Sequence, residues 1–434
     1  MGKYIIRDTL FVPVDGIKRD KQWLAGDIAI QDDLIAEIGP NLTAKYPDYE
    51  VIDGKNSLVL PGLINCHTHA AMTMLRSYAD DLPLQEWLET KIWPREAHLQ
   101  SEDIYWGTML SILEMIKSGT TTFADMYFFM EQTAKAVEET GIRASLSRGM
   151  VGLGDSGELA FKESEELVKN WHGKAEGRIS CLLGPHAPYT CTPDYLERVM
   201  KLADSLKVGL HIHLAETLTE VENITKEYGL PPIKLMNSLG LFDGRHVLAA
   251  HCVHLTEEEI DILVKKKVGI AHNPESNMKL ASGIAPIPQL LAAGALVGLG
   301  TDGASSNNNL DMIGEMHTCA LLHKVATGDP TVLSAYQVLE MATLKGAQAL
   351  GLEKLGSLQP GYKADLIMLD LHKAHLTPHY DPIANLVYAA HSSDVKTVII
   401  DGNLVMKDYQ LLTIDEERVI FEAERLGQDL ISRQ

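Results

Sequence analysis

Two histidines separated by one residue, His67 and His69, follow a short apolar run at residues 63–66. Side chains alternate along a β-strand, so these two imidazoles would point to the same side and could reach one ion. The pair alone is weak evidence for a metal, because the chain contains 17 histidines and a second such pair, His211 and His213. Taken by itself, the pair leaves metal binding and two hydrogen-bonded histidines equally open.

More candidate ligands lie at equivalent places along the chain. His213, His251 and Asp302 each come directly after, or just beyond, an apolar run. If the runs are barrel strands, these side chains meet His67 and His69 at one mouth of the barrel. Neutral imidazoles with one carboxylate suit Zn²⁺ or Fe²⁺ and leave a position for water, whereas calcium or magnesium would need more oxygen ligands. We therefore expect a divalent metal, Zn²⁺ first and Fe²⁺ as the alternative.

A proton carrier is also available, because Glu216 lies three residues after His213. Its carboxylate could move a proton between a metal-activated water and a ring nitrogen or leaving group, and His251 could orient or deprotonate that water. The alternative is that Glu216 caps the next helix, but its position beside a ligand favours the chemical role. The fourth apolar run ends in Gly-Pro-His at 184–186 and offers no lysine to bridge two ions, so we expect one metal per chain.

Eight short apolar runs, separated by amphipathic segments of helical length, occupy residues 58–303. This rhythm predicts a parallel (β/α)8 barrel of the TIM type, in which catalytic groups come from the C-terminal ends of the strands. Each run does break into polar residues at its end. The eight runs are 63–66, 120–124, 143–146, 179–183, 208–212, 247–250, 268–271 and 296–299.

Alternating segments outside the barrel, at 4–12, 27–38, 365–369 and 397–406, are typical of further strands. Asp-Gly pairs at 15–16, 53–54 and 401–402 suit tight turns between them. We therefore predict a small β-sandwich domain built from both chain ends, residues 1–58 and 363–434. The catalytic barrel is predicted to span residues 59–362.

The composition describes a globular chain of 434 residues with 45% hydrophobic and 22% charged residues. A formal charge of −21 argues against nucleic acid or an anionic membrane as partner, since both attract clustered Lys and Arg. Prolines interrupt the longest apolar stretch, 284–301, so we expect no membrane span. Five scattered cysteines and no apolar leader predict a reducing, cytoplasmic location. A homo-oligomer is expected on the base rate for such chains.

Five motifs that together cover nearly the whole chain resemble those of the amidohydrolase superfamily. Within it, the sequence is most similar to the 5'-methylthioadenosine/S-adenosylhomocysteine deaminases, with triazine chlorohydrolases and guanine deaminases as nearer or farther relatives. The motifs are PGLINCHTH, HIHLAE, HNPESNMKLASG, GLGTDGASSNN and LQPGYKADLIMLD.

This resemblance implies particular roles for the candidate residues. Asp302 would also touch the attacking water and the substrate, Glu216 would be the proton shuttle in contact with the substrate, and His251 would assist near the water or leaving amine. The implied metal ligands are His67, His69, His213 and Asp302.

The resemblance also assigns substrate contacts: Glu96 to the ribose hydroxyls, Arg148 to the polar tail and His186 to the purine or sugar. A carboxylate can accept from two vicinal hydroxyls, and an arginine fork matches a carboxylate such as that of a homocysteine tail. The alternatives are a structural ion pair for Arg148 and an exposed helix position for Glu96.

Several further polar or aromatic residues have structural interpretations. We expect His211 to be a hydrogen-bonded core histidine below His213. Asp125 and Asn273 are expected to hold loops by hydrogen bonds, and two tryptophans of the first loop could wall a purine pocket or simply pack. These tryptophans are Trp87 and Trp93.

The implied reaction is hydrolytic deamination of the adenine C6 amine of 5'-methylthioadenosine and S-adenosylhomocysteine, with adenosine and 5'-deoxyadenosine as further substrates. The products would be the inosine analogue and ammonia, formed by a metal-activated water with Glu216 as proton shuttle. The alternatives are a guanine deaminase, a triazine chlorohydrolase, or a barrel that has lost catalysis and only binds. A complete set of ligands with an acid beside it argues against the last.

Overall fold

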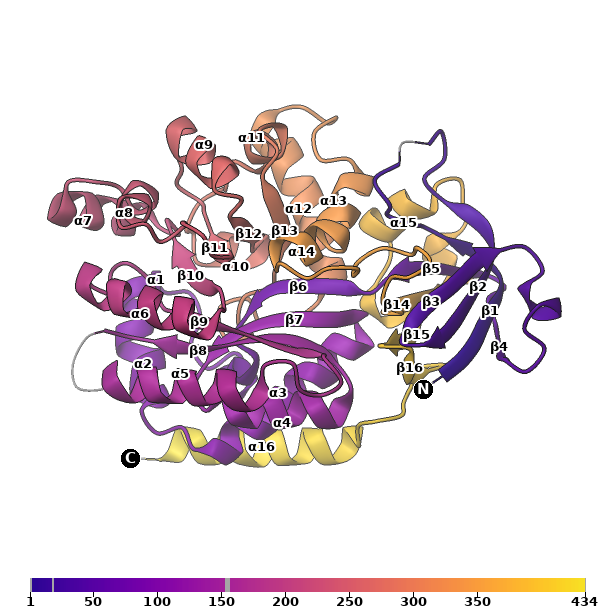
Figure 1. Cartoon of the computed structure of the whole chain (residues 1–434), viewed down its shortest axis with the longest axis horizontal. Coiled ribbons are helices and arrows are strands. Elements are labelled where there is room, and N and C mark those ends of the chain that lie inside the picture. Colours follow the sequence, from indigo (N-terminus) through magenta and orange to yellow (C-terminus); the bar gives the residue numbers. More distant parts are fainter. Residues whose placement is uncertain (1, 18, 153–156, 434) are drawn as a thin grey trace.

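The computed structural model describes residues 2–17, 19–152 and 157–433. It contains an eight-stranded barrel surrounded by helices and, beside the barrel, a nine-stranded sheet (Figure 1). The sheet combines indigo and yellow strands, so it is built from both ends of the chain. The predicted fold class, a TIM-like barrel with a small β domain from both termini, is confirmed.

All eight predicted barrel strands are present, and neighbours pair in parallel in chain order. Their residues are buried almost without exception, which explains why the sequence shows continuous apolar runs instead of strict alternation. The strands are β6 (Leu63–Thr68), β7 (Thr120–Tyr127), β8 (Arg143–Met150), β9 (Ile179–Pro185), β10 (Leu210–Leu214), β11 (Val247–His251), β12 (Gly269–His272) and β13 (Leu296–Leu299).

Contacts between the first and last strands bring the two ends of this sheet together. The Asn65 side chain donates to the Thr301 hydroxyl at 2.8 Å and accepts from the Thr301 backbone N–H at 3.0 Å. The N–H of Asp302 donates to the carbonyl of His67 at 2.9 Å. The polar residues at the ends of β6 and β13 therefore become neighbours.

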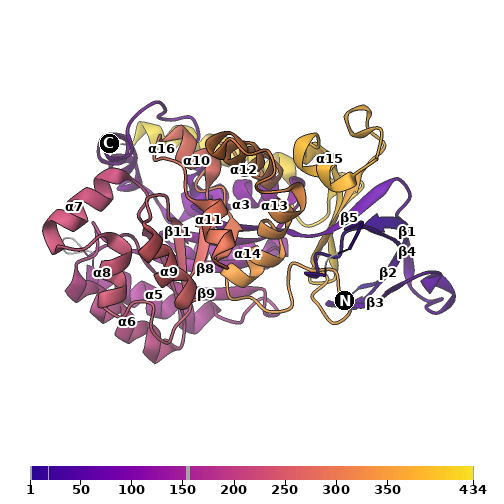
Figure 2. The same cartoon turned by 90° about the horizontal axis from the view of Figure 1, so that it is seen from above.

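Helices follow the barrel strands and cover the barrel from outside (Figure 2). Several end at glycines with positive φ, as at Gly141 (85°), Gly229 (75°) and Gly328 (67°), where a residue without Cβ relieves strain. The longer ones are α3 (Ser101–Lys117), α4 (Met130–Thr140), α5 (Gly157–Trp171), α6 (Pro193–Leu206), α7 (Leu218–Tyr228), α9 (Glu257–Lys265) and α12 (Met312–Thr327).

Shorter helices decorate the loops and the region after the barrel. The first loop carries a helical segment broken into α1 (Leu84–Trp87), a π-helical turn (Leu88–Ile92) and α2 (Trp93–Glu96). The others are α8 (Pro232–Ser238), α10 (Pro274–Lys279), α11 (Ile287–Ala292), α13 (Ala335–Met341), α14 (Leu344–Ala349) and α15 (Pro382–Tyr388), with 3-10 turns at Leu42–Ala44, Ala70–Leu75, Ala374–Leu376 and Ser392–Asp394.

The strands outside the barrel form one continuous, mixed sheet in the order β17-β16-β15-β14-β5-β1-β2-β3, with β4 also paired to β1. Residues from both ends of this path share one core, as Ile6, Ile35 and Ile399 do, so the sheet folds over itself like a sandwich. The strands are β1 (Gly2–Phe11), β2 (Leu24–Asp32), β3 (Leu34–Gly39), β4 (Glu50–Asp53), β5 (Ser57–Pro61), β14 (Leu366–Asp370), β15 (Val395–Ile400), β16 (Asn403–Lys407) and β17 (Gln410–Leu411).

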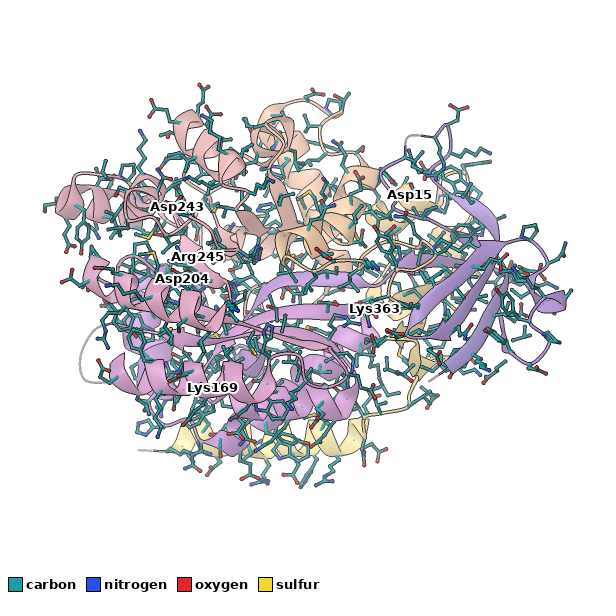
Figure 3. All side chains as sticks on the ribbon, in the orientation of Figure 1. Asp15, Lys169, Asp204, Asp243, Arg245 and Lys363 are labelled. Atoms are coloured by element: carbon teal, nitrogen blue, oxygen red, sulfur yellow. The ribbon has the colours of Figure 1, made fainter. Side chains whose placement is uncertain are left out.

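Buried ion pairs join the bottom of the barrel to this sheet. The Arg143 guanidinium, at the start of β8, donates to Asp365 at 2.8 Å and to Asp401 at 2.8 Å. Lys363 extends the network, lying 2.6 Å from Asp33 and 3.0 Å from Asp401, at the junction labelled in Figure 3. The N-terminal end of β8 is thus occupied by structural contacts, on the side of the barrel away from the mouth where catalytic groups of such barrels lie.

The last helix, α16 (Glu416–Ser432), packs against α3 of the barrel and is drawn in yellow along one side of it in Figure 1. An ion pair between Lys117 and Glu416, 2.6 Å apart, joins the two helices. The domain limits at residues 58/59 and 362/363 stay a prediction. Among the described residues, no helix is both long and apolar enough to cross a membrane.

Candidate metal centre and active site

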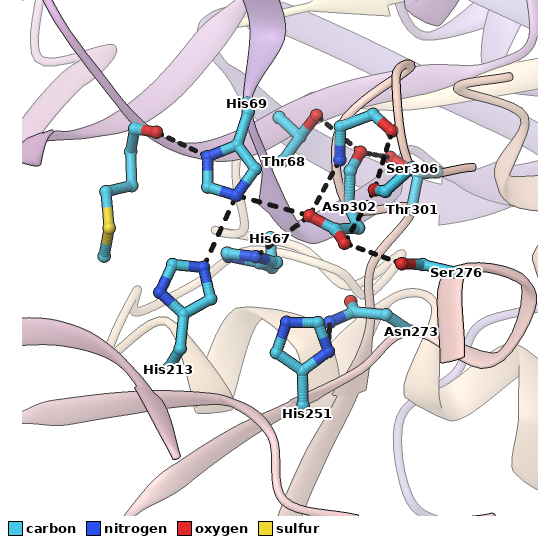
Figure 4. Close-up of polar contacts among 12 residues, drawn as sticks. His67, Thr68, His69, His213, His251, Asn273, Ser276, Thr301, Asp302 and Ser306 are labelled. Atoms are coloured by element: carbon cyan, nitrogen blue, oxygen red, sulfur yellow. Dashed lines mark hydrogen bonds and ion pairs between the residues drawn. The ribbon is translucent and has the colours of Figure 1, made fainter. Parts of the chain in front are cut away.

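Four side chains converge at the C-terminal mouth of the barrel (Figure 4). Asp302 Oδ1 lies 3.3 Å from Nε2 of His67 and 3.3 Å from Nε2 of His69. Nε2 of His213 faces Nε2 of His69 at 3.4 Å. His67, His69 and His213 form one group able to hold a metal ion, and Asp302 forms another with His67 and His251. The structure therefore brings together all four residues that the sequence suggested as ligands.

Backbone carbonyls fix the orientation of two of these imidazoles. Nδ1–H of His69 donates to the carbonyl of Met126 at 2.6 Å, and Nδ1–H of His213 donates to the carbonyl of His186 at 2.7 Å. With the proton on Nδ1, the lone pair on Nε2 points into the shared centre. This arrangement is typical of histidines that ligate metals.

His67 is oriented in the same way, but by another histidine. Its Nδ1 lies 2.9 Å from Nε2 of His211, and Nδ1 of His211 lies 3.4 Å from the hydroxyl of Ser147. If His67 donates to His211 and His211 donates to Ser147, three of the four nitrogens in these two rings have a hydrogen-bond partner. The fourth is Nε2 of His67. His211 is buried, as expected, but its partner is one of the candidate ligands.

Asp302 is held by three donors. Its Oδ2 accepts from the hydroxyls of Ser276 at 2.7 Å and Ser306 at 2.8 Å, and its Oδ1 accepts from the N–H of Gly303 at 2.8 Å. The residue has φ of 61°, in the left-handed region. Such strain is maintained by surrounding contacts and is common at functional sites. One lone pair of Oδ1 remains available toward the histidines.

The donor set fits a divalent metal. Nε2 of His67 is buried and has no hydrogen-bond partner, which is costly unless something else occupies its lone pair. Burial lowers the pKa of His67 to about 4 and holds that of His213 well below its ordinary value, so both imidazoles are neutral, as metal ligands must be. Burial also lowers the pKa of His69, but Asp302 outweighs it and raises the value to about 9. A cation at the centre would compete with that proton.

A second buried group, His272, Cys319 and His323, could also hold an ion by composition. The Nε2 atoms of His272 and His323 lie 3.1 Å apart. Unlike the candidate ligands above, both histidines leave Nδ1 buried without a hydrogen-bond partner. In a histidine that ligates a metal, the other ring nitrogen nearly always donates a hydrogen bond. This group is therefore better described as a hydrogen-bonded pair of histidines beside the Cys319 thiol.

Glu216 and His251 lie beside the four convergent side chains. Oε2 of Glu216 is 3.8 Å from Nε2 of His251, and Oε1 accepts from the hydroxyl of Ser282 at 3.4 Å. Both residues are buried, and burial raises the pKa of Glu216 above that of an ordinary glutamate. A raised pKa brings a carboxyl closer to the range in which it can both take and give a proton.

Asn277, in the short helix α10, orients His251, and Asn273 lies next to the same ring nitrogen. Nδ1 of His251 is 2.9 Å from Oδ1 of Asn277 and 3.3 Å from Nδ2 of Asn273. With Nδ1–H donating to Asn277, Nε2 is an acceptor that faces Glu216. Asn273, which we expected to hold a loop, therefore also contacts a candidate site residue, whereas Asp125 does hold a loop by accepting from Ala70 N–H at 2.8 Å.

A cavity of about 760 Å³ opens over this centre and is lined mainly by apolar and aromatic side chains, Trp87 and Trp93 among them. This size and character suit a small organic ligand. His67 is fully buried. The other eight candidate residues line the cavity: His69, Glu96, Arg148, His186, His213, Glu216, His251 and Asp302.

The three residues suggested for substrate contact have different surroundings. Glu96 accepts from the hydroxyl of Tyr127 at 2.7 Å, and burial raises its pKa. His186 lies 3.0 Å from the hydroxyl of Thr190, and burial lowers its pKa to about 3, so it is neutral. Arg148 donates to Glu163 at 2.7 Å and to the carbonyl of Gly149. The ion pair expected as the structural alternative for Arg148 thus exists, inside the lining of the cavity.

The model of the amidohydrolase family matches residues 58–405. The chain belongs to the amidohydrolase family. This match extends over most of the chain and includes all the candidate site residues named above. The predicted resemblance is confirmed.

Individual amidohydrolase relatives give a finer comparison. A 5-methylthioadenosine/S-adenosylhomocysteine deaminase of Syntrophomonas wolfei is 60% identical over 412 residues, covering 94% of this chain and 95% of the relative. A solved adenosine deaminase of Xanthomonas campestris with bound zinc has a TM-score of 0.94 and 34% identity, covering 100% and 99% of the two chains. An atrazine chlorohydrolase of Arthrobacter aurescens complexed with zinc has a TM-score of 0.90 and 27% identity, covering 98% and 100%.

Sequence reasoning missed the residues that orient the centre of this amidohydrolase. Asn277 and Ser276 lie within the HNPESN motif, so their place next to a recognised segment was a usable signal. The carbonyls of Met126 and His186 carry no signal at all, because any residue supplies a carbonyl. Their role depends on how neighbouring strands pair.

Proposed function

We propose that this amidohydrolase removes the C6 amine of 5'-methylthioadenosine and S-adenosylhomocysteine, and of related adenine nucleosides, by hydrolysis. The observation that carries the proposal is the convergence of three imidazoles and one carboxylate beside a buried glutamate in a cavity of about 760 Å³. The name of the relative that is 60% identical supports the choice of substrate. The 34% identical adenosine deaminase supports adenosine as a further one.

His67, His69, His213 and Asp302 would hold one divalent metal, and two structural neighbours solved with zinc support Zn²⁺ over Fe²⁺. When bound, the metal supplies Lewis-acid activation of a water molecule as the nucleophile. Asp302 would also contact that water. A nucleoside that fills the mainly apolar cavity would keep other water away from the reacting atoms.

Glu216 is the proton shuttle in this proposal. It takes a proton from the attacking water and delivers it to the ring nitrogen next to C6 while the C6–O bond forms. His251, held by Asn277, accepts a hydrogen bond on Nε2 from the hydroxyl that forms at C6 and so orients the tetrahedral carbon. Glu216 then transfers the remaining hydroxyl proton to the amine, the C6–N bond breaks, C6 becomes a carbonyl and ammonia leaves.

The remaining cavity residues would recognise the nucleoside. Glu96 accepts from the ribose hydroxyls, His186 contacts the purine or sugar, and Arg148 meets the carboxylate of a homocysteine tail. For the uncharged methylthio group of the smaller substrate, the apolar wall around Trp87 is the complementary surface.

The test is ammonia release from S-adenosylhomocysteine, 5'-methylthioadenosine, adenosine, guanine and a chlorotriazine by metal-loaded protein and its Glu216→Gln variant. We expect turnover of the first two to exceed that of guanine and to fall by roughly 100-fold or more in the variant. Metal content, measured in both proteins, separates loss of the proton shuttle from loss of the metal. Turnover restricted to guanine or to the triazine would refute the substrate, and turnover unaffected by Glu216→Gln would refute the mechanism.

The five cysteines are all free and buried, which supports a reducing, cytoplasmic environment.

A homo-oligomer stays a prediction from the base rate, and light scattering of the purified protein tests it.

A further inference from the structure

Glu220, a buried carboxylate with no part in the chemistry proposed above, lies directly behind Glu216. Its Oε1 accepts from the N–H of Ala215 at 2.9 Å, and its Oε2 accepts from the N–H of Glu216 at 2.8 Å. Only 5% of Glu220 is exposed. Both oxygens are therefore used to hold the backbone of the residue that the mechanism needs to place accurately.

The turn that Glu220 holds is strained. Ala215 has φ of 52°, in the left-handed region that residues with a Cβ rarely adopt. Such a conformation persists only when contacts from outside the turn maintain it. Glu220 supplies these contacts on one side of the turn.

The opposite side of the turn is attached to the loop that follows His251. The carbonyl of Ala215 accepts from the N–H groups of Val253 and His254, at 3.0 Å each. The turn after β10 is thus clamped between Glu220 and the loop after β11. This clamp fixes the relative position of Glu216 and His251, whose side chains lie 3.8 Å apart.

We propose that Glu220 is a positioning residue for deamination: by binding two backbone N–H groups, it fixes Glu216 in the orientation that proton transfer requires. The inference rests on the proposed function, because it assigns Glu220 a role only through Glu216. It adds a residue that touches neither metal, water nor nucleoside.

Helix capping alone does not account for this contact. Thr217 already caps α7, since its hydroxyl accepts from the N–H of Glu220 at 3.1 Å. In a standard capping box the glutamate at the third helical position accepts from the N-cap residue itself. Glu220 instead reaches one and two residues further back along the chain, to Glu216 and Ala215.

The neighbouring helix α9 contains the standard arrangement and provides a matched control. Glu259 occupies the same helical position, is 2% exposed and accepts from the N–H of its N-cap residue, Thr256, at 2.9 Å. It has the same residue type, helical position and depth, but its carboxylate hydrogen bonds go to Thr256 and none goes to the turn that carries Glu216. Comparing Glu220→Gln with Glu259→Gln therefore isolates the contact with the turn.

The experiment measures kcat, KM, metal content and thermal stability for both variants, with the nucleoside that the wild type turns over best. Glu220→Gln directs an amide NH₂ at one of the two backbone donors, so we expect kcat to fall by roughly 10- to 100-fold with KM changed less than about threefold. Metal content should stay at the wild-type level. Glu259→Gln should lose a similar amount of stability and keep kcat within about twofold.

A double mutant separates positioning from general destabilisation. If Glu220 acts through Glu216, adding Glu220→Gln to Glu216→Gln should cause almost no further loss of kcat, because the function of Glu216 is already gone. A further 10-fold loss in the double mutant, or equal kcat values for the two single variants, would overturn the proposal. If Glu220→Gln does not fold, Glu220→Asp, which keeps the charge on a shorter arm, carries the same comparisons. Absence of any nucleoside turnover by the wild type would instead refute the proposed function.

Discussion

Nδ1 of His67 lies 2.9 Å from Nε2 of His211. His211 precedes the candidate ligand His213 by two residues on β10, yet it supports another candidate ligand, His67, on β6. The two rings meet nearly at right angles, with an interplanar angle of 81°. This geometry suits a hydrogen bond from the edge of one imidazole to the nitrogen lone pair of the other. His211 thereby determines which nitrogen of His67 is free for a metal.

We expect His211→Phe, which keeps a ring but removes the acceptor, to weaken zinc binding about 10- to 100-fold. The measurement is retention of zinc during competition with a chelator. His211→Gln, which keeps an acceptor oxygen, should recover part of the affinity. His323→Phe is the control, because His323 is equally buried and hydrogen-bonded to another histidine, yet lies outside the centre. Equal zinc affinity in all these proteins would show that His211 only fills space.

Arg148 should discriminate between the two proposed substrates. S-adenosylhomocysteine has a carboxylate in its tail, whereas 5'-methylthioadenosine has none. A charge-assisted hydrogen bond contributes about 1.5–3 kcal/mol, so Arg148→Met should lower kcat/KM for the first substrate by roughly 10- to 100-fold more than for the second. Steady-state kinetics with both nucleosides measures this ratio.

The contrary result has a clear structural meaning. If both substrates lose equally and the melting temperature falls, Arg148 serves mainly in its pair with Glu163, 2.7 Å away. Arg198→Met controls for loss of a surface charge, because Arg198 forms its pair with Glu158 in the open, with side chains 51% and 75% exposed.

Much of the fold could be predicted because barrel strands are buried on both faces. The continuous apolar runs located every strand of the barrel, although β6, β10 and β11 extend further and contain His67, His213 and His251. Outside the barrel, the segment 27–38 is two strands that turn beyond Asp32, whose φ is 56°. Non-glycine residues adopt this conformation too seldom for the sequence to signal the turn.

The residues of the candidate site also fall into those that the sequence could predict and those that it could not. Side chains at strand ends could be predicted, since barrel closure brings all such positions together whatever the details of packing. Their partners could not, because contacts such as those of Met126 and Asn277 depend on the register of neighbouring strands and on loop geometry. The sequence also gives no sign that Glu220 turns back to the HLAE segment instead of facing solvent.

Loss of Arg143 should destabilise the protein strongly, because it would leave two buried carboxylates, Asp365 and Asp401, without their main cation. Breaking a buried ion pair from one side costs about 3–5 kcal/mol. We expect Arg143→Met to lower the free energy of unfolding by that amount in chemical denaturation. Arg198→Met, at an exposed pair, should change it by about 1 kcal/mol or less. A small effect of Arg143→Met would mean that Lys363 can replace it.

Glu220 should also make stability depend on pH. Burial raises its pKa to about 7 in the folded protein, although two backbone donors oppose the shift, whereas an unfolded glutamate titrates near its ordinary value of about 4.3. The folded state therefore binds a proton more tightly. The contribution of neutral Glu220 to stability is fully present below about pH 4.3 and is lost as pH rises through about 7.

Glu220→Gln cannot titrate, so the stability of the variant relative to wild type should improve as pH rises from about 4 to 8, by up to roughly 3 kcal/mol. Chemical unfolding of both zinc-loaded proteins at several pH values measures this difference, in which the titrations shared by the two proteins largely cancel. A difference that does not change with pH would mean that Glu220 ionises like an exposed glutamate. Its two hydrogen bonds to the turn would then fully offset the cost of burial.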